Sequence, residues 1–239
     1  MQDFDALVAE ADAVPLQGWD FSWFEGRATE QRPSWGYADQ LAERLKRATT
    51  ALDLQTGGGE VFAYASAGSP ALLVAVEAWL PNVEVAARNL EHVVESDRVP
   101  FRDGVFDLVS SRHPVTTPWP EIARVLRPGG VFLSQQIGPG TNRELSEAMM
   151  GPLPPPVPTD PGQAAEAVGL EVLQIRRERL RVEFYDIAAV AHFLRKVVWT
   201  VPGFTVAKYR DQLRKVHDEI LAEGRFVSYA VRVLIEARK

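Results

Sequence analysis

ALDLQTGGGE, residues 51–60, is the stretch of this sequence that decides its fold. It begins as a short apolar strand that carries Asp53, continues with glycines at Gly57, Gly58 and Gly59, and then starts a helix. Glycines at such a strand-to-helix turn let the backbone pass close to a ligand and adopt angles that a side chain would forbid. The pattern predicts a site for a nucleotide-like ligand, and a plain tight turn is the alternative.

Short apolar runs recur along the chain around this stretch. They lie at residues 50–54, 71–76, 106–110 and 131–135, and helical stretches separate them at residues 60–67, 82–92 and 121–126. Continuous apolar runs of this length are typical of strands buried on both faces of a parallel sheet. Residues 226–237 instead alternate between apolar and polar side chains, which is typical of an antiparallel strand. The sequence therefore predicts an α/β fold with a doubly wound, mostly parallel sheet and an antiparallel last strand.

The length and composition fit a single domain over residues 1–239. The chain is 46% hydrophobic and 24% charged, so one large α/β domain can bury its own core. Its N-terminal part, residues 1–48, contains helices and an aromatic-rich loop, and a ligand-binding core follows at residues 49–150. A proline-rich loop covers residues 151–161. The C-terminal half of the sheet covers residues 162–239, with helices inserted at 186–223. There is no cysteine, which excludes disulfides, thiolate nucleophiles and cysteine-ligated zinc.

Charge and hydropathy limit the location and the partners. The first twenty residues lack the basic start and apolar stretch of a secretory signal, so we expect a cytoplasmic protein. No apolar run reaches the roughly 18 to 20 residues that span a bilayer, so we expect no membrane partner. The net charge of −6 argues against binding to the phosphate backbone of a nucleic acid. A nucleic-acid partner stays open, because arginines cluster between Arg176 and Arg181; the alternative is a solvated strand face of mixed charge.

A second acidic residue supports the ligand site. Glu77 ends the next predicted strand, 18 positions after Gly59, where an acid is placed to bind ribose hydroxyls. A charge at a helix N-terminus is the alternative interpretation. Phe62 stands where a dinucleotide fold would need a third glycine, and no Gly-Lys pair of a phosphate loop occurs. We therefore expect a ligand that is not held by its phosphates.

With these residues the chain resembles the class I S-adenosyl-L-methionine (SAM)-dependent methyltransferases, of the type 11 kind, from about residue 49 to residue 133. The first motif of that family, (D/E)-x-G-x-G-x-G, is matched at Asp53, Gly57 and Gly59, whereas Gln55 replaces the first glycine. Glu77 takes the position of the family's ribose-binding acid. ESDRVPFRDGVFDLVSSRH (residues 95–113) and EIARVLRPGGVFL (residues 121–133) look like the family's later strands and the helix between them.

The resemblance implies a seven-stranded sheet and SAM as the cofactor. It also implies that residues 1–48 form a helical and aromatic lid over the cofactor, although the aromatic segment at 19–37 also fits a hydrophobic plug at the sheet edge. Arg32 in this segment is placed to hold the cofactor's carboxylate. The other residues that we expect to bind SAM are Asp53, Thr56, Gly57, Gly58, Gly59, Glu77, Ala78, Glu95, Ser96 and Ser110.

Methyl transfer from a sulfonium requires few catalytic side chains, because the cofactor carries the reactive group. The loop after the fourth strand of the family lacks an Asn-Pro-Pro-Tyr sequence and offers His113 as a general base. A capping or surface histidine is the alternative. We predict no metal site.

The sequence thus predicts a SAM-dependent methyltransferase that acts on a small molecule. An RNA or protein methyltransferase and a non-catalytic SAM-binding protein are the two alternatives. The acceptor atom and the oligomeric state do not follow from the sequence.

Overall fold

A computed structural model describes residues 3–16 and 21–239. Trp19, which belongs to the predicted lid, lies outside the described residues. The chain divides into two compact units. We call the first the helical unit (Met1–Arg32, Pro139–Val157 and Arg179–Val231) and the second the glycine-loop unit (Pro33–Gly138, Pro158–Glu178 and Arg232–Lys239). The prediction of a single domain over residues 1–239 stays a prediction.

The described strands form one sheet in the order β1-β7-β8-β6-β5-β2-β3-β4. Five of them are parallel neighbours in the glycine-loop unit, listed in spatial order: β6 (Leu126–Ile137), β5 (Phe106–Arg112), β2 (Thr50–Leu54), β3 (Leu72–Glu77) and β4 (Val93–Glu95). The last strand, β8 (Phe226–Arg238), pairs with β6 in the antiparallel direction. The predicted fold class, α/β with a mostly parallel sheet and an antiparallel last strand, is confirmed.

The sheet has eight strands among the described residues, one more than the seven predicted. The additional strand is β1 (Ala28–Glu30), which pairs in the antiparallel direction with the end of β7 (Glu171–Phe184). It lies within the segment predicted as helices and an aromatic loop. Only three residues long and polar, it has no apolar pattern of its own, and Phe184 opposite Ala28 supplies the apolar contact.

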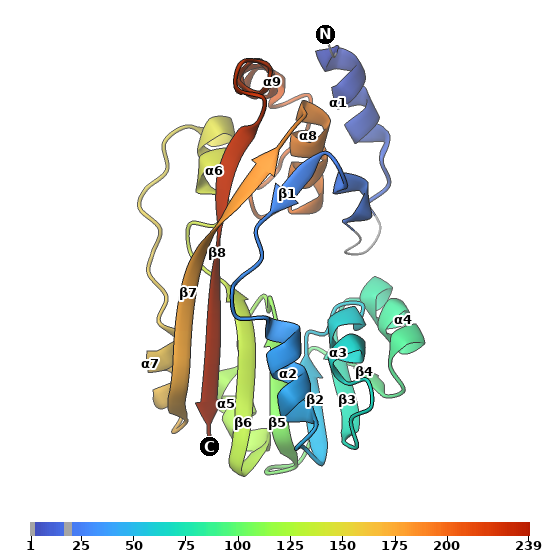
Figure 1. The fold of residues 1–239 in the computed structure, drawn as a ribbon, viewed down its shortest axis with the longest axis vertical. Helices are drawn as coiled ribbons and strands as arrows, with labels where there is room; N and C mark the ends of the chain where they lie inside the picture. The colour runs from blue at the N-terminus through green and yellow to red at the C-terminus, as the bar shows by residue number, and fades with distance from the viewer. Residues whose placement is uncertain (1–2, 17–20) are drawn as a thin grey trace. The chain divides into compact units, whose positions relative to one another are not determined.

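Helices cover both faces of the sheet in the glycine-loop unit (Figure 1). On one face lie α2 (Tyr37–Leu45), α3 (Glu60–Ala65) and α4 (Leu80–Asn89). Apolar side chains of α2 and α3 pack on inward residues of neighbouring strands such as Ala51 and Leu133. On the other face α5 (Trp119–Val125) and α7 (Pro161–Glu166) pack over Leu52 and Phe132. The unit is therefore doubly wound, as the alternation of apolar runs and helices predicts.

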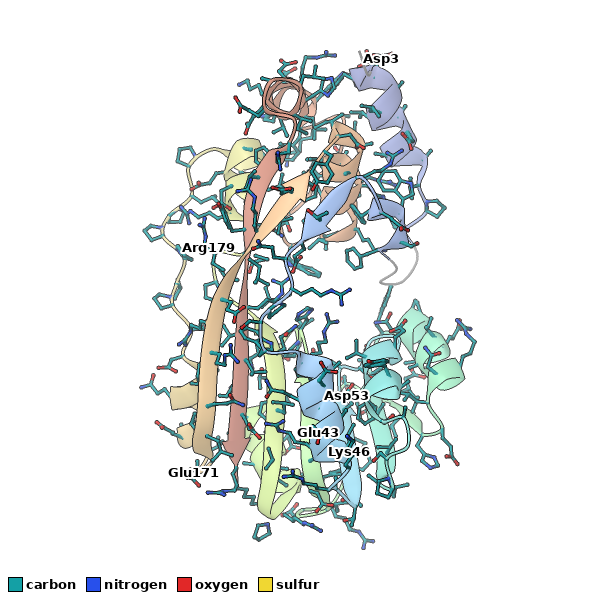
Figure 2. The ribbon with its side chains drawn as sticks, viewed as in Figure 1. Asp3, Glu43, Lys46, Asp53, Glu171 and Arg179 are labelled. Carbon is teal, nitrogen blue, oxygen red and sulfur yellow. The ribbon has the colours of Figure 1, made fainter. Side chains whose placement is uncertain are left out.

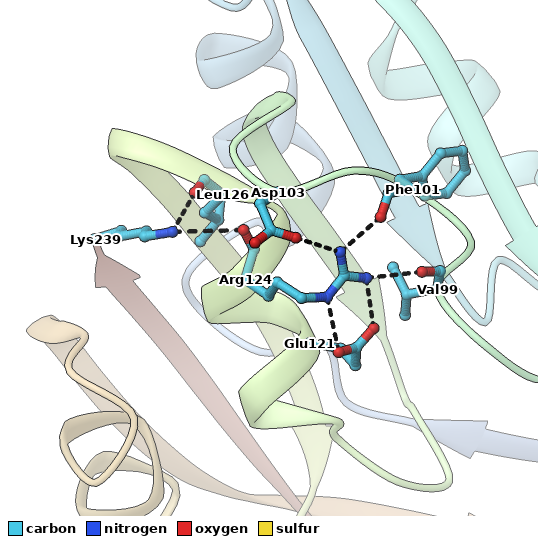
Figure 3. A network of polar contacts seen from close by, with 7 residues as sticks. All are labelled: Val99, Phe101, Asp103, Glu121, Arg124, Leu126 and Lys239. Carbon is cyan, nitrogen blue, oxygen red and sulfur yellow. Dashed lines mark hydrogen bonds and ion pairs between the residues drawn. The ribbon is translucent and has the colours of Figure 1, made fainter.

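Arg124 ties α5 to the loop before β5, at the amino end of the strands (Figure 3). Its guanidinium donates two hydrogen bonds to Glu121 and one to Asp103, at 2.6–2.9 Å. It also donates to the backbone oxygens of Val99 and Phe101, at 2.9 and 2.6 Å. All five donors lie in the guanidinium plane, which suits arginine and not lysine. Arg124 thus fixes the loop before β5 against α5.

The helical unit packs around α8 (Ile187–Lys196), in which Ile187 to Leu194 include six fully buried apolar residues and the buried His192. Asp186 begins this helix by accepting a hydrogen bond from Ala189 N at 2.7 Å. Around it lie α1 (Phe4–Ala13), the short helix η1 (Ser22–Phe24), α6 (Arg143–Met150) and α9 (Arg210–Glu223). Residues 151–160 contain no helix or strand, which agrees with the predicted proline-rich loop. Within residues 3–16 and 21–239, no helix has the length and hydropathy needed to cross a membrane.

Candidate functional site

The glycine loop between β2 and α3 has the backbone that its residues predict. Gly57 and Gly59 have φ angles of +64° and +77°, in the left-handed region that glycine adopts without strain. A Cβ atom at Gly59 would lie 2.8 Å from the Leu90 side chain, so the loop packs tightly on its inner side. At Gly57, by contrast, no atom lies within 4 Å of the place of a Cβ. The loop thus leaves room at Gly57 for a ligand to approach the backbone.

Gln55 occupies the position of the family's first glycine and has a φ of +53°. Such an angle costs a non-glycine residue about 1–2 kcal/mol. Its side-chain amide donates to Thr116 O at 2.6 Å and accepts from Val115 N at 2.7 Å. Neutral hydrogen bonds of this kind contribute about 0.5–1.5 kcal/mol each, enough to offset the strained angle. The Gln55 side chain therefore reaches across to the loop after β5.

Glu77 lies at the carboxyl end of β3 and is buried. One carboxylate oxygen accepts from Gly57 N at 2.8 Å, and the other accepts from Ala78 N and Trp79 N, both at 3.0 Å. The acid predicted to hold a ribose therefore contacts the glycine loop directly. Thr56 N, in the same loop, donates to Val76 O at 3.2 Å, which keeps the loop against the end of β3.

Asp53, labelled in Figure 2, is a buried carboxyl group at the carboxyl end of β2. Ser110 Oγ, from the neighbouring residue of β5, donates to it at 2.6 Å. Burial, reinforced by the charge of Glu77, raises the pKa of Asp53 to about 6, although the Ser110 bond opposes this shift. Tyr37, the first residue of α2, lies beside both groups, and burial followed by the Asp53 charge raises the pKa of its phenol. The Tyr37 hydroxyl is buried without a hydrogen bond of good geometry.

The remaining predicted residues of this unit lie at the same edge of the sheet. Glu95, which ends β4, is opposite Glu77 in the strand register and is exposed. Ser96 N donates to Glu77 O at 3.0 Å. Gly58 O accepts from the Asn89 side chain at 2.8 Å, which fastens the loop to α4. Asp53, Glu77, Glu95 and Ser110 therefore come from four adjacent strands and meet at their carboxyl ends, the edge at which open α/β sheets bind ligands.

His113 follows β5 and also has a left-handed backbone, with φ at +56°. Its Nε2 lies 2.9 Å from Gln135 Nε2, while Gln135 Oε1 accepts from Trp35 Nε1 at 2.7 Å. Because the amide oxygen is engaged by Trp35, the amide nitrogen donates to His113, whose Nε2 is then an acceptor. Burial, together with the charges of Arg112 and Arg232, lowers the pKa of His113 to about 2. The ring is neutral and held by its neighbours, and its role as a general base stays a prediction.

Two further outcomes concern residues at the margins of the site. Arg32 is an exposed residue of the helical unit, so its contact with the cofactor's carboxylate stays a prediction. Trp35 and Tyr37 belong to the aromatic segment at 19–37, which was predicted as a lid or a plug, whereas Gln135 was not predicted to belong to the site. Gln135 carried a usable signal, because it is a polar residue within a predicted buried run, as Asp53 and Ser110 are. Trp35 and Tyr37 were predicted only as members of their segment, because aromatic side chains fit a lid and ordinary packing equally well.

Comparison with known proteins agrees with this geometry. Residues 52–134 match a family model described as a methyltransferase domain. None of the curated proteins is similar in sequence. A solved structure of a candidate methyltransferase from Bacillus halodurans C-125 is 20% identical, with a TM-score of 0.58 over 84% of this chain and 99% of that one.

Two other similar structures have lower sequence identity. A candidate sarcosine dimethylglycine methyltransferase from Galdieria sulphuraria is 16% identical, with a TM-score of 0.52 over 100% of this chain and 98% of that one. Geranyl diphosphate C-methyltransferase from Streptomyces coelicolor A3(2) is 14% identical, with a TM-score of 0.52 over 84% and 76%. At these identities the likeness shows the fold.

The fold is therefore that of the class I SAM-dependent methyltransferases. Residues 52–134, which include the glycine loop, Glu77 and β5, match the methyltransferase domain, and this match together with the fold indicates SAM as the cofactor. The resemblance and the cofactor predicted from the sequence are confirmed. The individual contacts to the cofactor remain a proposal.

Proposed function

We propose that this protein transfers the methyl group of SAM to a small-molecule acceptor, with the cofactor held at the carboxyl ends of β2 to β5. The observation that carries the proposal is the contact between Glu77 and Gly57 N, which joins the ribose-binding acid to the loop that has room for a ligand. One acceptor position of that carboxylate oxygen remains for a ribose hydroxyl, because a carboxylate oxygen accepts two hydrogen bonds.

The residues fit the chemistry of the cofactor. SAM supplies an electrophilic methyl group on a sulfonium, together with an ammonium and a carboxylate. Asp53 offers a buried carboxyl group with a pKa of about 6. A cation beside it would favour the ionised form and compensate its burial. Glu95 and Ser96 lie beside Glu77 at the same edge, and we assign them to the adenine of the cofactor.

A small acceptor is supported by two observations. The net charge of −6 gives little attraction for an RNA backbone. In addition, two proteins with this fold are named for small molecules: geranyl diphosphate C-methyltransferase and the candidate sarcosine dimethylglycine methyltransferase. The arginines between Arg176 and Arg181 do not form a free basic stripe, because Arg176, Arg179 and Arg181 pair with nearby glutamates.

Isothermal titration calorimetry with S-adenosylhomocysteine tests the cofactor site. We expect micromolar binding to the wild type and binding weakened at least about tenfold by Glu77→Ala, because the variant loses ribose contacts worth more than about 1.4 kcal/mol. Glu91→Ala is the matched control, since Glu91 is an exposed acid that pairs with His92 at a distance of 3.9 Å. Absence of binding to the folded wild type would overturn the proposal.

Incubation with methyl-labelled SAM then separates the acceptor classes. We expect label in the small-molecule fraction of a cell extract and none in its RNA or protein fractions. Label in RNA or protein would replace the small-molecule acceptor by a macromolecule. Tight binding of SAM with no label in any fraction would favour a non-catalytic SAM-binding protein.

A further inference from the structure

We propose that Gln55 is a positioning residue that couples the glycine loop to the loop at residues 113–117, so that binding of the cofactor fixes the segment facing the acceptor. The proposal rests on the proposed function, because it assigns the glycine loop to SAM. We call residues 113–117 the His113 loop.

The coupling is made by both ends of one amide. Gln55 accepts a hydrogen bond from Val115 N at 2.7 Å and donates one to Thr116 O at 2.6 Å. It therefore pairs with the backbone of two consecutive residues instead of with a side chain that can turn away. A glycine, which the family has at this position, could make neither bond.

Gln55 holds the part of the His113 loop that the rest of the fold leaves loosely attached. The two ends of the loop are fastened to β6: His113 N donates to Gln135 O at 2.7 Å, and Gln136 donates to Thr117 Oγ1 at 3.1 Å. In the middle, Pro114 has no N–H to donate, and Val115 is 90% exposed. The position of Val115 and Thr116 thus depends on the Gln55 amide.

Backbone strain at Gln55 and at His113 also supports a coupling between the two loops. Gln55 and His113 have φ angles of +53° and +56°, and they are two of the three residues other than glycine with positive φ among the described residues. Non-glycine residues keep such angles where the surrounding structure requires them, often at ligand sites. Here the two strained residues lie at the ends of neighbouring parallel strands, β2 and β5, and the Gln55 bonds join their loops.

The direction of the coupling follows from the position of the Gln55 backbone in the glycine loop. Its backbone lies two residues before Gly57, whose N–H is bound by Glu77. A ligand that orders the glycine loop therefore also fixes the Gln55 backbone. Through the Gln55 side chain it then fixes Val115 and Thr116. The cofactor would in this way prepare the His113 loop before the acceptor arrives.

Hydrogen exchange measured by mass spectrometry, with and without S-adenosylhomocysteine, tests this inference. In the wild type we expect the ligand to slow exchange at least fivefold in peptides that cover the glycine loop and in peptides that cover the His113 loop. In Gln55→Gly, which restores the family residue and relieves the strained angle, we expect bound ligand and protection of the glycine loop but no protection of the His113 loop. Gln55→Glu, which can still accept from Val115 N but cannot donate to Thr116 O, should give intermediate protection.

Gln136→Ala is the matched control, because it removes a bond to the same loop from β6 and leaves the Gln55 bonds in place; ligand-dependent protection of the His113 loop should persist in it. Protection of the His113 loop that persists in ligand-bound Gln55→Gly would overturn the inference. So would its absence in the ligand-bound wild type. A wild type that binds no S-adenosylhomocysteine would overturn the proposed function and this inference with it, and calorimetry distinguishes that case.

Discussion

Asp53 carries a charge that the apo fold does not favour. Its pKa is 3.8 when exposed and about 6 in the fold, chiefly because of burial. A carboxyl group with a raised pKa in the fold binds its proton more tightly there than in the unfolded chain, so its contribution to stability falls as pH rises from about 4 to 6. Above pH 6 the cost is on the order of 3 kcal/mol, at 1.36 kcal/mol per pKa unit.

We therefore expect Asp53→Asn, which keeps an oxygen for the Ser110 hydroxyl, to stabilise the apo protein at pH 8 but not at pH 4. Urea unfolding across this pH range measures the difference in free energy of unfolding between variant and wild type. Asp97→Asn, at an exposed acid beyond β4, serves as the control and should show no such trend. A difference that does not change with pH would show that the fold does not raise the pKa of Asp53.

His113 offers a choice between a chemical role and a backbone role. As a general base it would have to accept a proton on a ring whose pKa is about 2 and whose Nε2 already accepts from Gln135. If it is the base, His113→Ala and His113→Asn both slow turnover by about 100-fold. The geometry favours a backbone role, in which Asn, which tolerates a left-handed φ, keeps the rate within about threefold while Ala does not.

The measurement is the initial rate of methyl transfer to the acceptor fraction that takes up label, between pH 5 and pH 9. If His113 has the backbone role, the wild type and the His113→Asn variant should show the same dependence of the rate on pH around pH 6.5. Equal, large losses in both variants would restore His113 as the base.

At the scale of single residues, the sequence predicted the functional residues that belong to a local motif. Asp53, the glycines and Glu77 lie within one strand-turn-helix unit and the strand after it, and the fold brings them together. The contacts of Tyr37 and Gln135 with this edge escaped prediction, because they arise from long-range packing that no local pattern records. The consequence of Gln55 was also hidden, since its partners are the backbone atoms of a loop 60 residues away.

At the scale of elements, prediction succeeded where burial leaves a periodic trace. β2 and β8 begin and end within one residue of the predicted bounds, because continuous or alternating apolar residues follow from the burial of their faces. β6 starts at Leu126, five residues before the predicted start at 131. The segment Arg127–Pro128–Gly129–Gly130 is polar and contains two glycines, yet it joins the strand with Gly129 at φ +80° and a register shift on the partner β5. An irregularity of this kind depends on the neighbouring strand, so the sequence of β6 alone does not show it.

At the scale of the whole molecule, the chain divides into two units that share their strands. β7 begins in the glycine-loop unit and ends in the helical unit, and β8 runs the opposite way. The family match at residues 52–134 lies wholly within the glycine-loop unit, which explains why sequence analysis assigned functional residues mostly there. The helical unit is assembled from three separate segments of the chain, so neither unit corresponds to a continuous stretch that could be expressed alone.

Because two continuous strands belong to both units, we expect them to unfold together. Unfolding of one unit would release about half of β7 and half of β8. The other halves of these strands, in the unit that is still folded, would then end abruptly. Differential scanning calorimetry should then show one transition, lowered by Leu133→Ala in the glycine-loop unit and equally by Leu194→Ala in the helical unit. Both leucines are fully buried. Each substitution should cost about 2–5 kcal/mol and lower the midpoint by roughly 5–15 °C. Two transitions, each moved by only one of the variants, would instead show two domains that fold independently in spite of the shared strands.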